Sequence, residues 1–127
     1  DLRSTPSCTY SYPEVASVGM SEEQAVESGY QPVSGTYRLA ALGKALAMGE
    51  DAGYVTVTAD KETGLVLGAR MMGAHVTDVI HEVAVAVHSG LTVEQLGQTI
   101  HAHPTIAEAV MEAAHDVHGD SVHIASR

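Results

Sequence analysis

The sequence has no Phe and no Trp, and its only aromatic residues are 5 Tyr. Basic residues are also scarce, because 6 Lys and Arg stand against 16 Asp and Glu, giving a formal net charge of -10. Nucleic-acid binding usually needs a basic surface and aromatic stacking platforms, so the composition predicts no nucleic-acid partner. An acidic solubility surface explains the charge, and adaptation to a salty cytoplasm is the alternative.

The chain has a single cysteine and no long apolar run. Cys8 cannot form an internal disulfide, which fits a reducing cytosol, and we expect it to be a small buried residue rather than a reactive thiol. No apolar stretch approaches the roughly 20 residues that cross a bilayer, and residues 1–6 lack the pattern of a signal peptide. The sequence therefore predicts a cytoplasmic protein with no membrane partner.

A chain of 127 residues fits one domain and is large enough to bury a core without a metal or disulfides. We expect a linker remnant over residues 1–7, the domain over 8–115 and a tail, disordered or variable, over 116–127. Because the linker leads directly into the first expected strand, we expect the chain to be an excised part of a larger protein.

Alternating apolar and polar residues predict strands in the first part of the chain. These strands are expected at 8–12, 33–39, 53–59 and 65–72, with Val55 and Val57 on one face and a hairpin turn at 60–64 that gives Gly64 a positive φ. A capping box at Ser21 predicts a short helix that ends at Gly29. Residues 42–48 are expected to be irregular.

After Gly73 the apolar period changes from two to 3.6, which predicts helices. One helix face collects Val76, Val79, Ile80, Val83, Ala84 and Val87. Thr77 is the expected N-cap of this helix and Gly90 its stop. Capping boxes at Thr92 and Thr105 predict two more helices, the last running to about His115. Strands followed by helices indicate an α+β fold, an antiparallel sheet with helices packed on one face.

The segment 101–108 carries the strongest chemical signal. It places His103 on an extended stretch before a helix and Glu108 in the first turn of that helix. A carboxylate in this position can orient the imidazole, select its tautomer and favour its charged form, as a general base requires. Thr105 and Glu108 also match a routine capping box, in which Glu108 would serve the backbone instead. The spacing alone leaves both interpretations open.

The 8 histidines allow a rival interpretation, a stand-alone metal-binding module. The best candidate ligands are His115, His118 and His123. His81 and His88 are two helical turns apart, which makes them poor joint ligands. Zinc sites need three or four convergent ligands, which the sequence does not assemble.

Segment 101–108 resembles the signature of the dihydrolipoamide dehydrogenase family, and its His-Pro-Thr-x-x-Glu pattern recurs in glutathione reductase. The resemblance extends in register over about residues 6–114 and matches the family's C-terminal dimerisation domain. The matching segments are 11–19, 35–48, 63–68, 73–75 and 111–114. One departure is Ala107, a position where the family more often has serine and which we expect on the helix surface.

The resemblance implies a homodimer that pairs through this domain. It implies that His103 is the acid–base residue of the partner subunit's flavin and redox-disulfide site, that Glu108 orients it, and that the backbone of His103 and Pro104 lies near the partner's FAD. It also implies a cis His103–Pro104 bond. The parent enzyme would use FAD and NAD to oxidise dihydrolipoamide, and would bind the dihydrolipoyl acyltransferase of a 2-oxoacid dehydrogenase complex.

This chain lacks the machinery for that reaction. No Gly-x-Gly-x-x-Gly follows a strand, and Cys8 alone cannot supply a redox cysteine pair. We therefore expect that the chain binds neither FAD nor NAD by itself and is inactive alone, and that its role is homodimerisation through its apolar helix face. The alternative is a stand-alone His-rich metal-binding or protein-interaction module.

Overall fold

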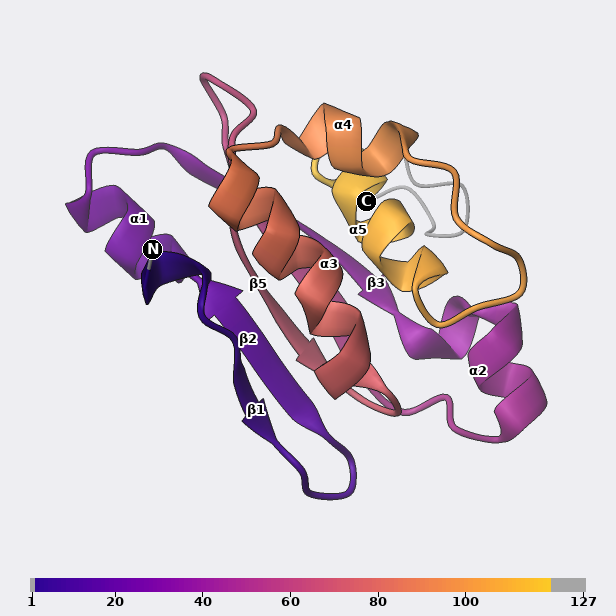
Figure 1. Ribbon diagram of the computed structural model, residues 1–127. Coiled ribbons are helices and arrows are strands. Elements are labelled where there is room, and N and C mark those ends of the chain that lie inside the picture. The colour runs from indigo at the N-terminus through magenta and orange to yellow at the C-terminus, as the bar shows by residue number, and fades with distance from the viewer. Residues whose placement is uncertain (1, 120–127) are drawn as a thin grey trace.

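The computed structural model describes residues 2–119 and shows an antiparallel sheet with helices on one face (Figure 1). The strand order is β1-β2-β5-β4-β3, and every neighbouring pair is antiparallel. The strands are β1 (Ser7–Thr9), β2 (Val15–Gly19), β3 (Pro32–Arg38), β4 (Tyr54–Asp60) and β5 (Val66–Met72). The predicted α+β class and the placement of the helices on one face are confirmed.

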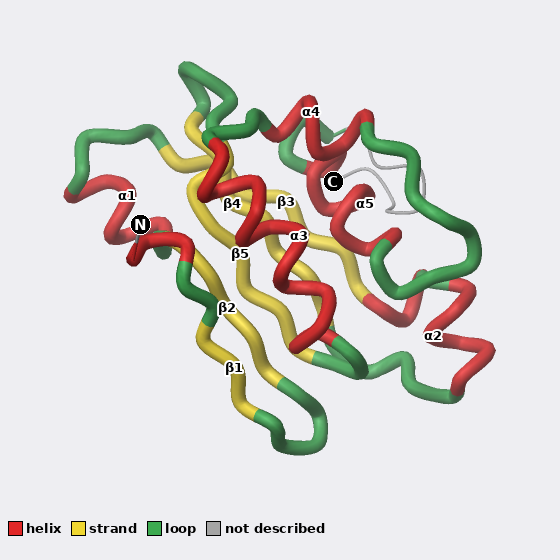
Figure 2. Tube along the Cα trace, viewed as in Figure 1, coloured by secondary structure: helices red, strands yellow, loops and turns green. Residues whose placement is uncertain are grey.

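The remaining elements are helices, which Figure 2 shows along the chain. They are the 3-10 helices η1 (Leu2–Ser4) and η2 (Leu39–Ala41) and the α-helices α1 (Glu22–Glu27), α2 (Gly43–Met48), α3 (Val76–Ser89), α4 (Val93–Gln98) and α5 (Glu108–Asp116). α3 packs over β5 and β2, and α5 packs over β3 and β4 and against α4. These three helices make up the layer that covers the sheet.

The local signals in the sequence account for most of these elements. In β4, Val55 and Val57 face the helices and are fully buried, as the alternation predicts. The capping boxes at Ser21 and Thr92 both form. Gly90 ends α3 in the left-handed conformation, and Gly64 takes φ 77 in the β4–β5 turn. These predictions are confirmed.

The predictions for α2 and for the start of α3 are wrong. Residues 42–48 are not irregular, because the helix formers around Ala45, which is fully buried, build α2, and Gly49 caps it with a left-handed conformation. The N-cap of α3 is not Thr77 but His75, which has a left-handed φ of 64. The carboxylate of Glu14, contributed by the segment before β2, accepts the backbone and hydroxyl hydrogens of Thr77 at 3.3 and 3.0 Å. A distant side chain therefore replaces the local cap.

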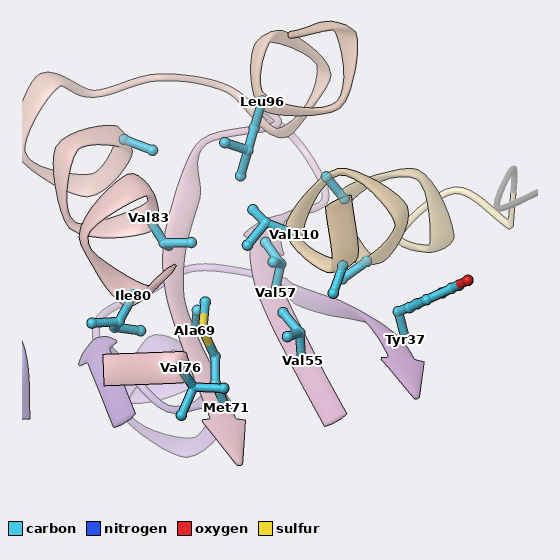
Figure 3. Close-up of a cluster of buried hydrophobic side chains, with 14 of the residues drawn as sticks. Tyr37, Val55, Val57, Ala69, Met71, Val76, Ile80, Val83, Leu96 and Val110 are labelled. Carbon is cyan, nitrogen blue, oxygen red and sulfur yellow. The ribbon is translucent and has the colours of Figure 1, made fainter. Parts of the chain in front are cut away.

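The core lies between the sheet and the helices and contains almost no aromatic volume. Figure 3 shows Ile80 and Val83 of α3, Val110 of α5 and the strand residues Val55 and Val57 gathered in one cluster. All five side chains are fully buried. Branched aliphatic residues therefore do most of the packing, as the missing Phe and Trp require. The prediction that the apolar helix face forms the dimer interface is wrong, because Val76, Ile80 and Val83 are fully buried against the chain's own sheet.

The contact between α5 and β3 depends on a glycine. A Cβ on Gly35 would lie 2.2 Å from the carbonyl oxygen of Ala113 and 2.4 Å from the backbone nitrogen of Val117. Both atoms belong to the backbone at the C-terminal end of α5, so neither can rotate away. At the same place, the carboxylate of Asp116 accepts a hydrogen bond of 2.9 Å from the backbone nitrogen of Thr36.

The predicted domain boundaries, 1–7, 8–115 and 116–127, stay predictions. η1, which lies in the predicted linker, contacts α3 and β2, and α5 extends to Asp116, one residue beyond the predicted end of the domain. Residues 120–127 of the predicted tail lie outside the described residues. Over residues 2–119, no helix is long and apolar enough to cross a membrane.

The first prediction concerns Gly35. Gly35→Ala should destabilise the chain by about 1–3 kcal/mol or more, because the new methyl group overlaps backbone atoms that cannot relax. The free energy of unfolding from urea titration measures this loss. Gly43→Ala is the matched control, since a Cβ there meets nothing within 4 Å and should leave stability unchanged or slightly higher. Equal stability of the two variants would contradict the close packing of α5 on β3.

Candidate functional site

His103 and Glu108 form a side-chain pair at the start of α5. Nδ1 of His103 lies 3.0 and 3.1 Å from the two carboxylate oxygens of Glu108. The two partners differ in exposure, because the His103 side chain is 78% exposed and that of Glu108 only 15%. The carboxylate of Glu108 is therefore largely buried, while the imidazole of His103 is largely exposed.

Glu108 serves the backbone as well as the histidine. Its Oε1 accepts the backbone hydrogen of Thr105 at 2.8 Å, which is one half of a capping box. The other half does not form, because α5 begins only at Glu108 and its N-cap is Ala107. The Thr105 hydroxyl instead donates to the carbonyl oxygen of Ala102 at 2.7 Å. The predicted helix start at Thr105 is therefore wrong, and both interpretations of Glu108 describe part of the site.

Electrostatics favour an ionised Glu108. Burial alone would raise the pKa of Glu108, but the hydrogen bonds from His103 and from the Thr105 backbone, with the charges of His103 and His101, hold it below its ordinary value. An ionised carboxylate accepts hydrogen bonds only. The Nδ1 atom of His103 is therefore a donor, and the neutral ring keeps its acceptor lone pair on Nε2.

His103 lies in the exposed connection between α4 and α5. The His103–Pro104 bond is cis, as the resemblance implies, and Tyr12–Pro13 is a second cis bond that was not predicted. Ala102, His103 and Pro104 are all exposed, whereas the following Ile106 is buried. The loop therefore presents its histidine outward from a buried anchor.

A second pair, between His101 and Glu82, was missed by the sequence analysis. Nε2 of His101 contacts a carboxylate oxygen of Glu82 on α3, and its Nδ1 lies 2.7 Å from the carbonyl oxygen of Thr99. The His101 side chain is only 7% exposed. The motif did single out His101, but no spacing pattern connects it to a residue 19 positions earlier on another helix.

Tyr37 is another ionisable group in this region that was missed. Its ring is fully buried below α5, and its hydroxyl donates to the carbonyl oxygen of Ala41 at 2.9 Å. Burial, followed by the carboxylates of Glu112 and Glu108, raises the pKa of Tyr37 to about 12. The phenol therefore stays protonated at neutral pH.

Of the three rival metal ligands, the structure describes His115 and His118, and each contacts a different acceptor on α4. His115 contacts the carbonyl oxygen of Gly97 at 2.7 Å, and His118 contacts the carboxylate of Glu94 at 2.8 Å. His123 lies outside the described residues. Among residues 2–119, no group of three or more His, Cys, Asp or Glu could hold a metal ion. Cys8 is a half-buried free thiol that packs against the core.

The fold and the matched segments define the class of protein. The family model for the pyridine nucleotide-disulphide oxidoreductase dimerisation domain matches residues 5–114. The chain belongs to this family.

The curated relatives include proteins named dihydrolipoyl dehydrogenase. The one from Halobacterium salinarum is 40% identical over the whole chain, and one from Bacillus subtilis is 45% identical over 93% of it. The matched region makes up 27% and 25% of these two proteins, so the chain spans about a quarter of their length.

Solved structures share the same fold. LpdA from Mycobacterium tuberculosis superposes with a TM-score of 0.83 at 25% identity, over 90% of this chain and 25% of that one. The HOCl-induced flavoprotein disulfide reductase RclA from Escherichia coli gives 0.81 at 29% identity, over 87% of this chain and 25% of that one. The expected family of the chain is confirmed.

The second prediction concerns Glu108 and pH. Folding lowers the pKa of Glu108 below its ordinary value of 4.5. The stability contributed by the charged carboxylate is therefore fully present above pH 4.5 and is lost as the pH falls through the pKa of the folded state. Glu108→Gln should therefore cost about 1 kcal/mol near neutral pH and progressively less in acid. Unfolding titrations at several pH values measure the difference. Glu62→Gln, at an exposed turn position, is the matched control and should cost little at any pH. A loss that does not change with pH would contradict an ionised, hydrogen-bonded Glu108.

Proposed function

We propose that this chain is the homodimerisation domain of a flavin-dependent dihydrolipoyl dehydrogenase, and that it donates His103 to the flavin and redox-disulfide site of the partner subunit. The observation that carries the proposal is the contrast within the His103–Glu108 pair. The carboxylate is held in the fold, while 78% of the imidazole side chain is exposed. A histidine that is oriented yet uncovered suits a reaction on a surface supplied by another subunit.

His103 would act as the acid–base group of that reaction. Glu108 fixes Nδ1 as a donor, so Nε2 can take a proton from a thiol of dihydrolipoamide and return it later in the cycle. The imidazolium that forms would be stabilised by the adjacent carboxylate. Within the described residues, Nε2 makes no hydrogen bond that would have to break first.

Pro104 and the backbone of His103 would lie against the partner's FAD. The exposure of Ala102, His103 and Pro104 leaves this stretch accessible to a flat ring system. The flavin, bound by other domains of the parent protein, would supply the electron transfer between the thiols and NAD. The residues of this chain would supply position and a proton site.

The rest of the enzyme would come from the parent chain. The relatives are about four times longer than this chain, which leaves room for FAD- and NAD-binding domains outside it. We propose that the chain binds neither cofactor alone and is inactive alone. The dihydrolipoyl acyltransferase of a 2-oxoacid dehydrogenase complex is a further proposed partner, and the proposed location is the cytoplasm.

The third prediction tests the role of His103. In the full-length protein, His103→Ala should reduce the turnover of dihydrolipoamide about 10²–10⁴-fold without dissociating the dimer, because the acid–base group is lost while the fold is kept. Steady-state kinetics and light scattering measure the two effects. His118→Ala is the matched control, since His118 also pairs with a glutamate on the surface and has no proposed role. Undiminished turnover of the His103 variant would refute the assignment of the base.

The fourth prediction tests dimerisation. Light scattering of the purified chain in the presence of a chelator should give a mass near twice 13.2 kDa, because the proposed interface is formed by the domain itself and needs no bridging metal. A monomer at micromolar concentration would mean that the flavin and nicotinamide domains are needed to form the dimer.

A further inference from the structure

Two histidine–glutamate pairs hold the two ends of one loop. Residues 99–105, called here the 99–105 loop, make up most of the connection between Gln98 of α4 and Glu108 of α5, and they carry His103. At its end, Glu108 of α5 binds His103 and the Thr105 backbone. At its beginning, Glu82 of α3 binds His101. The loop is therefore attached to two different helices.

The beginning of the loop is the more buried attachment. The side chain of His101 is 7% exposed and that of Glu82 is 28% exposed, against 78% for His103. Nδ1 of His101 faces the carbonyl oxygen of Thr99, which can only accept, so this nitrogen carries a hydrogen. Its Nε2 faces a carboxylate oxygen, so a second hydrogen lies between them. Both nitrogens are thus satisfied by fixed acceptors, and the ring has one orientation.

That orientation determines where the next residues point. Only Ala102 separates His101 from His103, and the carbonyl oxygen of Ala102 accepts the Thr105 hydroxyl. Within the described residues, no side-chain hydrogen bond other than that of His101 joins residues 99–102 to α3. If Glu82 were lost, the loop would keep its hydrogen bonds to α5 but would lose its side-chain hydrogen bond to α3.

We propose that Glu82 and His101 are positioning residues for the proposed reaction, which together hold the 99–105 loop on α3 and so place the imidazole of His103 in front of its substrate. This inference rests on the proposed function of His103. Neither residue would touch the substrate, and both would act through His103. A purely structural role would instead lower stability and activity whether or not His103 is present.

The experiment is a double-mutant cycle in the full-length protein. Glu82→Gln should lower kcat for dihydrolipoamide about 10- to 100-fold, because a displacement of about 1 Å in a reacting group can cost that much. The KM for NAD should change less than about twofold, since the loop is not proposed to bind NAD. In a His103→Gln background, whose residual turnover is the reference, adding Glu82→Gln should lower kcat less than about twofold.

Two further variants complete the design. Asp78→Asn removes the same charge one turn earlier on α3 at an exposed position, and should leave kcat within about twofold of the unmodified protein. His101→Asn keeps a donor near the position of Nδ1 but cannot reach Glu82. It should reproduce the loss of Glu82→Gln, and the two losses should not add. A thermal unfolding curve is recorded for each variant, and its kinetics are measured only at temperatures at which that variant is folded.

The outcomes separate the two proposals. If His103→Gln keeps full turnover, the proposed function itself fails. If His103→Gln loses turnover while Glu82→Gln keeps it, only the positioning proposal fails. It also fails if Glu82→Gln lowers kcat by the same factor with and without His103, because the effect then does not pass through the histidine.

Discussion

The structure depends on how closely α5 can approach the sheet. At Gly35 the backbone of β3 touches the backbone of α5, and any side chain there would overlap Ala113 and Val117. A second glycine fixes the other side of the helix, because a Cβ on Gly97 of α4 would lie 2.6 Å from the ring of His115. α5 is thus held between a strand and a helix by two close contacts. Since Glu108 is the first residue of α5, the carboxylate that orients His103 is positioned by the same packing.

The acidic composition determines which partners the carboxylates find. With only 6 Lys and Arg for 16 acidic residues, several carboxylates are satisfied by histidines and by backbone hydrogens. Glu82, Glu94 and Glu108 each contact a histidine. Asp60 accepts backbone hydrogens from Gln31 and Thr63, which, with the Thr63 hydroxyl, lower its pKa. Hydrogen bonds of this kind are stronger when the acceptor is charged. A chain with few cations therefore uses some of its histidines as structural donors. This fits the finding that, over residues 2–119, no group of three or more His, Cys, Asp or Glu could hold a metal ion.

The sequence predicts what is local and misses what is tertiary. Alternation at Val55 and Val57, the capping boxes at Ser21 and Thr92, and the turn glycines all act within a few residues, and each was predicted correctly. The N-cap of α3 was missed because Glu14, 63 positions before Thr77, takes the place of a local cap. The short helix α2 was missed because six residues are too few to show a clear period. In the site, the spacing of His103 and Glu108 was informative, but Glu82 is brought to His101 only by the packing of α3 beside the loop.

The geometry of the loop also explains how an exposed histidine can be held in one orientation. Ordering an exposed side chain costs conformational entropy, which an exposed ion pair offsets only weakly. Here the ordering is supplied from buried positions instead, since Glu108 and His101 are both largely covered while His103 is not. The folding of the domain thus orients the imidazole, which under the proposed function would remove that cost from the reaction itself. Such an arrangement gains its value only when a second surface covers His103, and a dimerisation domain is the part of an enzyme in which that surface can belong to another subunit.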